Sequence, residues 1–153
     1  MDMMKVGTDT SERDGLPPLL RDLLTYYGSK MTNGEVPSRG TDFNPATLRP
    51  WLGIVALIGC ENGASRFRLM GTKLMARFGQ EATGLAFDQM DVGSLGDLPD
   101  RVNRCCELTT PVLARAYSPD GRIEFVELLL PLRGPTGTID TVLLTALPAA
   151  KAS

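Results

Sequence analysis

The last third of the chain contains three apolar stretches joined by turns so short that neighbouring stretches must pair antiparallel. Val112 to Ser118 ends at Pro119-Asp120-Gly121, and Ile123 to Leu132 ends at Gly134-Pro135-Thr136-Gly137. The third stretch runs from Thr138 to Leu147. Proline, aspartate and glycine at such places are typical of tight turns. The pattern predicts a β-meander, so any fold of this chain must contain an antiparallel sheet.

Two more strands are predicted ahead of the meander. Leu52 to Gly59 is a continuous apolar run, and Ser65 to Met70 alternates apolar with basic residues. The Asn62-Gly63 pair between them is a strong hairpin signal. In the second strand we expect Phe67 and Leu69 to face the core and the arginines to face solvent. Together with the meander, these strands give a five-stranded antiparallel sheet.

Helical patterns fill much of the remaining chain. Thr72 to Phe78 predicts a short helix that Gly79 ends, and Thr83 to Met90 predicts another short turn. A longer helix is predicted to begin at Asp97, with Pro99 in its first turn. Two strands, short helices, a longer helix and three strands indicate an α+β fold whose helices gather on one face of the sheet.

An amphipathic N-terminal helix is predicted within residues 15–34. Its apolar positions recur at helical spacing: Leu16, Leu19, Leu20, Leu23, Leu24 and Tyr27. This stripe could pack on the chain's own sheet or be shared by two chains, and we take a homodimer interface as the prediction. Membrane docking is disfavoured because Lys and Arg are scarce on the polar face. Residues 1–14 are polar and aperiodic, which predicts a disordered tail, and residues 35–148 form the main domain.

The composition excludes several classes of protein. The chain has no histidine, which rules out Ser-His-Asp and Cys-His catalysis as usually built and imidazole metal sites. Its 16 basic and 18 acidic residues are spread along the chain, without the basic block of a nucleic-acid binder. No apolar run approaches the ~20 residues of a membrane span, and Met1 to Gly15 lacks the features of a signal peptide. We expect a cytoplasmic protein with no nucleic-acid partner and no membrane insertion.

The cysteines give a weaker signal. Cys60, Cys105 and Cys106 match no metal or disulfide spacing, so we expect buried free thiols in a reducing compartment and no bound metal. A redox pair of Cys105 and Cys106 is the alternative, and Arg101 and Arg104 support it only weakly.

Several short motifs resemble those of one family. In chain order they are Val36-Pro37-Ser38-Arg39, Asp42-Phe43-Asn44-Pro45, Phe67-Arg68-Leu69-Met70-Gly71-Thr72, Phe78-Gly79 and Thr83-Gly84. With the order of elements, they resemble the stand-alone PAS domains common in alphaproteobacteria, over about Pro37 to Leu147. The resemblance implies a PAS-like five-stranded antiparallel sheet with short helices packed on one face, to which the N-terminal helix is an addition.

The resemblance also implies a function. PAS domains bind small ligands between the sheet and the short helices, or bind partner proteins, and pass the change on. We therefore expect a sensory or regulatory protein and not an enzyme. Six residues follow Leu147, so the signal is expected to leave through an unidentified partner protein. No cofactor is predicted, because residues 72–78 lack the cysteine of light-sensing flavin domains and haem would need Met or Cys as its ligand.

A pocket follows from the same resemblance. We expect an apolar pocket, with or without a small ligand, lined by Leu69, Met75, Phe78, Phe87, Met90, Val102 and Cys105. Two other functions stay open. One is a ligand-free adaptor or structural module. The other is a small cone-shaped isomerase or hydratase with an Asp88 and Tyr117 pair.

Overall fold

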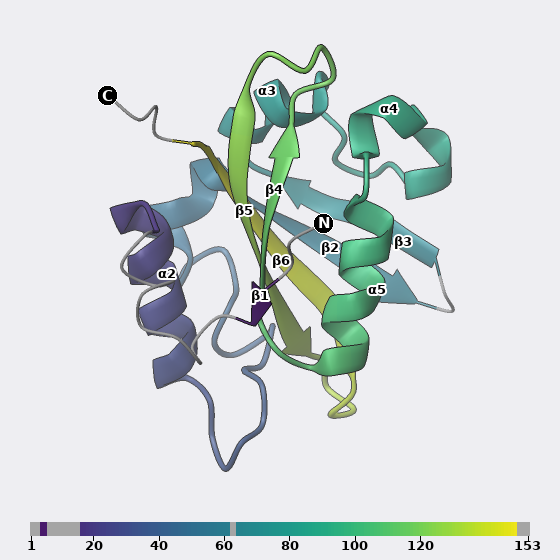
Figure 1. Cartoon of the computed structure of the whole chain (residues 1–153). Coiled ribbons are helices and arrows are strands. Elements are labelled where there is room, and N and C mark those ends of the chain that lie inside the picture. The colour runs from purple at the N-terminus through teal and green to yellow at the C-terminus, as the bar shows by residue number, and fades with distance from the viewer. Residues whose placement is uncertain (1–3, 6–15, 62–63, 150–153) are drawn as a thin grey trace.

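An antiparallel sheet runs through the middle of the computed structural model, which describes residues 4–5, 16–61 and 64–149. Within these residues it has six strands in the order β1-β4-β5-β6-β2-β3 (Figure 1). They are β1 Met4–Lys5, β2 Val55–Glu61, β3 Ala64–Met70, β4 Val112–Tyr117, β5 Glu124–Arg133 and β6 Ile139–Pro148. The predicted five-stranded sheet corresponds to β2 through β6, and the meander of β4, β5 and β6 is confirmed.

The sixth strand, β1, lies at the edge of the sheet beside β4. Met4 pairs with Leu113 and Lys5 with Val112. We predicted these two residues as part of a disordered tail, and the structure instead gives them a strand. The rest of that tail lies outside the described residues, as does the predicted turn at residues 62–63, although its flanking strands β2 and β3 pair antiparallel.

The helices lie on both faces of the sheet. They are α2 Pro18–Ser29, α3 Met75–Phe78, α4 Val92–Leu95 and α5 Leu98–Leu108, with short 3-10 turns η1 Arg49–Ile54, η2 Thr72–Leu74 and η3 Phe87–Gln89. Figure 1 shows α2 on one side of the sheet and α5 on the other. The predicted short helix ends at Gly79, whose φ of 77° is left-handed, as expected. Asp97 precedes α5 as predicted, but its side chain makes no capping hydrogen bond.

Gly71, where β3 passes into η2, is needed for a reason that the sequence does not show. Its φ of −66° is open to any residue, and Thr72 does not cap the turn through its hydroxyl. A Cβ at Gly71, however, would collide with the carbonyl oxygens of Leu52 and Gly53. Glycine is therefore required by the close approach of two main chains.

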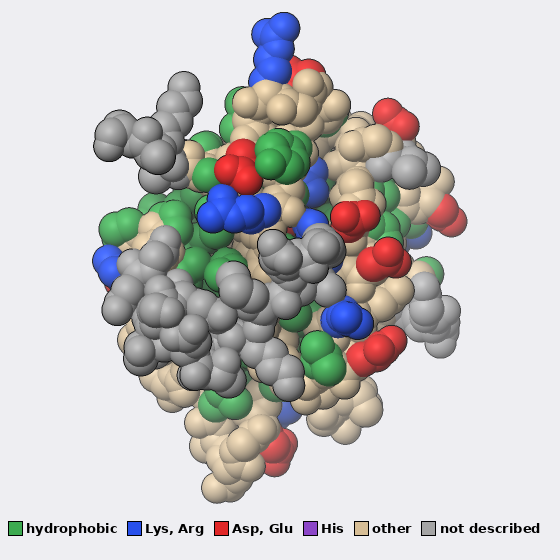
Figure 2. Space-filling model, viewed as in Figure 1, with side chains coloured by type: hydrophobic (Ala, Val, Ile, Leu, Met, Phe, Trp, Pro, Cys, Tyr) green, Lys and Arg blue, Asp and Glu red, His purple; other side chains and the backbone are tan. Residues whose placement is uncertain are grey.

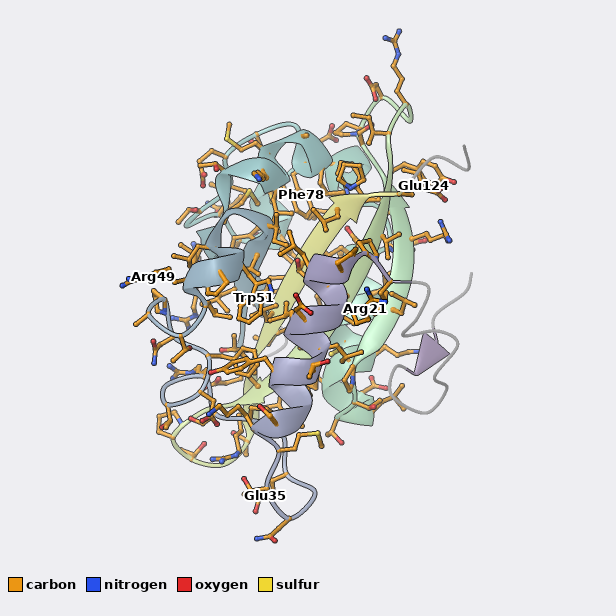
Figure 3. All side chains as sticks on the ribbon, turned by 90° about the vertical axis from the view of Figure 1, so that its left-hand side faces the viewer. Arg21, Glu35, Arg49, Trp51, Phe78 and Glu124 are labelled. Carbon is orange, nitrogen blue, oxygen red and sulfur yellow. The ribbon has the colours of Figure 1, made fainter. Side chains whose placement is uncertain are left out.

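The N-terminal helix α2 packs on the face of the sheet that we call the outer face (Figure 3). Leu16, Leu20, Leu23, Leu24 and Tyr27 are all buried, in a cluster with side chains of β5 and β6. The Tyr27 hydroxyl donates to the Pro131 carbonyl at 2.8 Å, and burial raises the pKa of Tyr27. The Trp51 indole N–H donates to the Leu19 carbonyl at 3.1 Å.

This packing changes the interpretation of the predicted homodimer interface. Five of its six side chains are covered by the chain's own sheet, which was the alternative reading of the stripe. Leu19 is 42% exposed and is the member still open to solvent. Whether two chains associate stays a prediction, but a second chain cannot cover the five buried side chains while α2 is docked.

Candidate functional site

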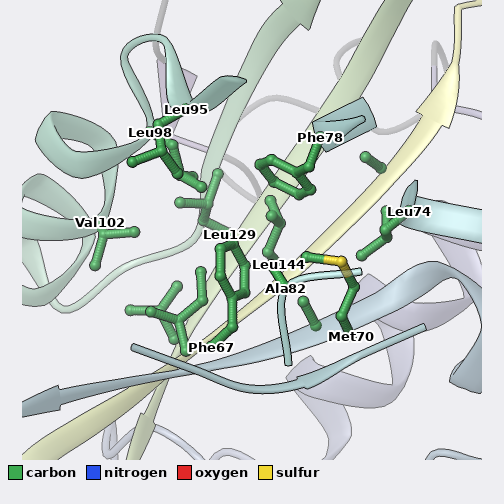
Figure 4. Packing of buried hydrophobic residues seen from close by; sticks show 14 of the residues in the cluster. Phe67, Met70, Leu74, Phe78, Ala82, Leu95, Leu98, Val102, Leu129 and Leu144 are labelled. Atoms are coloured by element: carbon green, nitrogen blue, oxygen red, sulfur yellow. The ribbon is translucent and has the colours of Figure 1, made fainter. Parts of the chain in front are cut away.

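The space between the sheet and helices α3, α4 and α5 is where the resemblance places a pocket. Buried apolar side chains from the sheet and these helices meet there in what we call the inner cluster (Figure 4). Five of the seven predicted pocket residues belong to it: Phe78, Phe87, Met90, Val102 and Cys105. The structure thus brings these five together, and their contact with a ligand stays a prediction.

Leu69, the first exception, lies outside the inner cluster because β3 contains a bulge. Consecutive residues of β2 pair with Leu69 and Phe67, which leaves Arg68 between them as an extra residue. The alternation of side chains therefore shifts by one residue after Phe67. Met70 joins Phe67 in the core, and Leu69 is only half-buried on the other face.

Met75, the second exception, points away from the core and is 40% exposed. The buried side of η2 and α3 is formed instead by Leu74, Arg77 and Phe78, which follow one another at helical spacing. Phe78 therefore lies in the core as predicted, and the prediction for Met75 was wrong. The predicted set also omitted Arg77, a charged residue that lies among the buried positions.

Aromatic rings occupy the middle of the inner cluster. The Phe67 ring lies 5.2 Å from the Phe78 ring and 5.3 Å from the Phe87 ring, measured between centroids. Such separations are typical of aromatic pairs in protein cores. A ligand at this position would have to displace rings that now contact one another.

A buried ionic group, which we call the Arg–Glu–Arg cluster, lies beside these rings. Glu127 of β5 is fully buried, and Arg77 and Arg101 are 2% and 4% exposed. Arg77 Nε donates to Glu127 Oε2 at 2.6 Å, and Arg101 Nη1 donates to Glu127 Oε1 at 3.4 Å. Each carboxylate oxygen thus faces one guanidinium. This pairing offsets the cost of burying the carboxylate, which is severe for an unpaired charge.

Arg77 joins four elements of the fold through its guanidinium. Besides Glu127 in β5, it donates to the carbonyls of Ser94 at 2.9 Å and Leu95 at 3.4 Å in α4. It also donates to the carbonyl of Tyr117, at the end of β4, at 3.3 Å. Four hydrogen bonds use most of the five N–H donors of an arginine. An anionic ligand would find at most one N–H of Arg77 not engaged in these bonds.

The Arg–Glu–Arg cluster was missed at the sequence level, although the sequence contains a signal for it. Glu127 interrupts an apolar strand, and its neighbours two residues away, Phe125 and Leu129, face the inner cluster. A lone carboxylate on a buried strand face requires cationic partners. Arg101 precedes Val102 on the inward stripe of α5 and was therefore a candidate partner.

The residues of the enzyme alternative do not form a site. Asp88 is exposed in η3, and Tyr117 is exposed at the end of β4. The Tyr117 hydroxyl donates to Glu124 Oε2 at 3.1 Å, and this hydrogen bond raises the pKa of Tyr117. The isomerase or hydratase interpretation needs the two in a closed polar cavity, so the geometry speaks against it.

Other classes of site find little support in the described part of the chain. No three His, Cys, Asp or Glu side chains within it come together to hold a metal ion. None of the helices described is long and apolar enough to cross a bilayer. Figure 2 shows acidic and basic side chains interspersed on the face that it displays, without a basic patch.

An open cleft of about 430 Å³ lies outside the inner cluster and adjoins it at Cys106, where α5 ends and the turn from β5 to β6 passes the loop before residue 37. Its lining residues are Gly34, Glu35, Val36, Cys106, Thr109, Arg133, Gly137, Thr138 and Ile139. Arg133 Nε donates to the Val36 carbonyl at 2.8 Å and thereby fixes one wall. The predicted pocket residues do not line this cleft.

Comparison with known proteins identifies the fold. Residues 17–145 match the family described as PAS domain. The chain belongs to the PAS domain family. Among solved structures it is similar to an RNA-binding light-oxygen-voltage (LOV) receptor, with 15% identity and a TM-score of 0.52 over 96% of this chain and 38% of that one. It is also similar to a sensory box sensor histidine kinase from Vibrio cholerae, with 11% identity and a TM-score of 0.48 over 96% and 100% of the two chains.

The family match and the similarity to the LOV receptor confirm the PAS fold that the motifs predicted. At 15% identity, and spanning 38% of the LOV receptor, the chain shares with it the fold alone. No curated protein matches the chain. PAS domains are typically sensory and not catalytic, which agrees with a sensor module.

Proposed function

We propose that this PAS domain is a sensory or regulatory module that signals through a partner protein and holds no ligand between its sheet and helices. The observation that carries the proposal is the Arg–Glu–Arg cluster. Together with the rings of Phe67, Phe78 and Phe87, it occupies the region in which PAS domains hold ligands. An apolar ligand, our other expectation, would have to separate those rings. Family membership supports the sensory role.

Native mass spectrometry and an absorption spectrum of the purified full chain test the ligand-free part of this proposal. We expect the mass of the polypeptide alone and no absorption in the visible range. The same preparation, denatured and extracted with organic solvent, is the control for a weakly held molecule. A small molecule retained at one equivalent per chain would overturn the ligand-free proposal.

Site-specific photo-crosslinking in cells tests the partner. A photoreactive residue is placed at three exposed apolar positions on separate elements: Leu19, Leu108 and Tyr117. A specific partner should be captured strongly from one position and not from all three, because an interface covers one part of the surface. Equal capture of the same proteins from every position would contradict a specific partner.

We further propose that two copies associate and that the chain works in the cytoplasm. Leu19 is the exposed member of the α2 stripe, and the three cysteines are free, as suits a reducing compartment. Light scattering of the full chain should give twice the monomer mass, and Leu19→Glu should lower it if α2 takes part. A monomer mass at every protein concentration in the micromolar range would contradict the dimer.

A further inference from the structure

The open cleft at the end of α5 brings together three segments that are distant in the sequence. They are the loop around Glu35, the last turn of α5, and the turn between β5 and β6 (Figure 1). Figure 3 shows Glu35 in the loop that follows α2. The cleft volume of about 430 Å³ falls within the range of about 300–1,000 Å³ that is typical of small-molecule sites. The cleft is therefore large enough for a small ligand.

Arg133 gives this cleft a cation whose position is fixed. Its main-chain N–H donates to the Pro37 carbonyl at 3.0 Å, and its own carbonyl accepts from the Arg39 N–H at 3.0 Å. Its Nε donates to the Val36 carbonyl at 2.8 Å. Within the described part of the chain, no hydrogen bond engages the two terminal nitrogens of Arg133. Their four N–H donors have the planar arrangement that fits a carboxylate.

Negative charge lies beside this cation. Glu35 Oε2 is 3.9 Å from Arg133 Nε. Helix α5 also ends at the cleft, since Thr109, the residue after its last one, is part of the lining. The last carbonyls of a helix have no partner within it and carry a partial negative charge, which no basic residue at positions 105–108 offsets. The cleft therefore has a positive and a negative side, without an excess of positive charge.

Apolar side chains and a threonine hydroxyl complete the cleft. Val36, Cys106 and Ile139 line it and are buried or half-buried. Thr109 has a φ of 52°, a left-handed conformation that is rare for a β-branched residue. Its hydroxyl makes no hydrogen bond with any residue that the structure describes. The lining thus combines an apolar surface with one more polar group that a ligand can contact.

We propose that this cleft binds a zwitterionic amino acid with a small apolar side chain. The ligand carboxylate accepts hydrogen bonds from the terminal nitrogens of Arg133. Its ammonium group donates to Glu35 and faces the negative end of α5, and its side chain lies against the apolar lining. A simple anion suits the cleft less well, because it would meet Glu35 and the helix end without a cation of its own.

The amino-acid site deepens the proposed function by supplying an input, and rests on it only for that meaning. The proposed function excludes a ligand between the sheet and the helices, whereas this cleft lies outside the inner cluster. Cys106 lines the cleft and also packs against that cluster, so α5 connects the two places. An open cleft exchanges its ligand with solvent, and we expect none to survive purification.

Nuclear magnetic resonance of the nitrogen-15-labelled full chain, titrated with L-leucine, tests the site. We expect saturable shifts, in the millimolar range, centred on the amides of Thr109, Gly137 and Thr138, which line the cleft. Shifts centred on Phe67 and Phe78 would place leucine in the inner cluster, and would overturn both this site and the ligand-free proposal. Shifts centred elsewhere, or no saturable shift up to the solubility limit of leucine, would overturn this site alone.

Two analogues of leucine test the two charges separately. Leucinamide keeps the ammonium group and lacks the carboxylate, whereas N-acetylleucine keeps the carboxylate and lacks the ammonium group. Each should bind about tenfold more weakly than leucine or worse, because each loses a hydrogen bond between charged groups. If N-acetylleucine bound as tightly as leucine, the cleft would be a site for anions and the proposal would be wrong.

Substitutions test the two residues that carry the proposal. Arg133→Gln and Glu35→Gln should each raise the Kd for leucine about tenfold or more. Arg122→Gln, which changes an exposed arginine in the turn between β4 and β5, is the control and should leave the Kd unchanged. Arg133→Gln also weakens the contact with Val36, so circular dichroism checks its fold. Glu35→Gln changes an exposed side chain, and an unaltered Kd in this variant would overturn the proposal on its own.

Discussion

Glu127 is the residue on which the buried charges of this domain depend. Both of its carboxylate oxygens face guanidinium groups that are almost fully buried. Glu127→Ala would leave these two cations without their shared counter-charge. Breaking a buried ion pair from one side costs about 3–5 kcal/mol, and we expect a loss of this size in the free energy of unfolding. Urea unfolding followed by circular dichroism measures it.

The matched control is Glu124→Ala, three residues earlier on the same strand. Glu124 pairs with Arg115 at 3.3 Å, but both side chains are partly or largely exposed. Exposed ion pairs contribute about 0–1 kcal/mol, so the free energy of unfolding of this variant should be close to that of the unmodified chain. Equal losses in the two variants would show that burial of the Arg–Glu–Arg cluster does not matter.

Gly71 gives a second prediction at the scale of one residue. Gly71→Ala places a methyl group against two carbonyl oxygens, which belong to main chain and cannot rotate away. Overpacking of this kind typically costs about 1–3 kcal/mol in the free energy of unfolding. Gly28→Ala is the control, because a Cβ there meets nothing within 4 Å and alanine favours the helix. Equal free energies of unfolding in the two variants would contradict the close approach of the two main chains at Gly71.

Cys106 should differ from the other cysteines in the pH dependence of its alkylation. Interaction with the Cys60 thiol lowers the pKa of Cys106 and raises the pKa of Cys60, and burial raises the pKa of Cys105. A lowered pKa means that thiolate persists to lower pH, so iodoacetamide should label Cys106 first as the pH rises. Mass spectrometry of the peptide that cleavage after Arg104 and Arg115 releases follows the labelling.

Cys60→Ala removes the thiol that lowers the pKa of Cys106 and should move the labelling of Cys106 to higher pH, while Cys60→Ser keeps a polar hydroxyl and should shift it less. Glu107→Gln removes a charge that opposes the thiolate and should move the labelling to lower pH. If the pH dependence of Cys106 labelling is unchanged in Cys60→Ala, Cys60 does not influence the pKa of Cys106.

Among the elements, those with a clear period could be predicted from the sequence and those shaped by contacts could not. The meander, the short helix before Gly79 and the helix after Asp97 lie where alternation and turn residues placed them. The bulge at Arg68 left no mark in the sequence, because bulges depend on the pairing with β2. One extra residue then reversed the expected orientation of Leu69 and removed it from the candidate site.

The docking of α2 on the outer face gives a prediction about this element. Leu23 is fully buried there, whereas Leu19 is 42% exposed on the same helix. Leu23→Ala should cost about 2–5 kcal/mol in the free energy of unfolding, because it removes core contacts and leaves a cavity. Leu19→Ala changes the same residue type in the same helix and should cost far less. Comparable losses would mean that α2 is not docked in solution as the structure has it.

In the whole molecule, both faces of the sheet are covered, and β5 shows the consequence. Leu128 and Leu130 lie on the outer face in one cluster with the buried side chains of α2, and Leu129 between them faces the inner cluster. An antiparallel sheet with one solvated face would alternate apolar with polar residues. The apolar run from Leu128 to Leu132 in β5 therefore favours a second layer over the sheet, which α2 supplies. Glu127 is unusual for the same reason: it is a charged residue on a strand whose two faces are both covered.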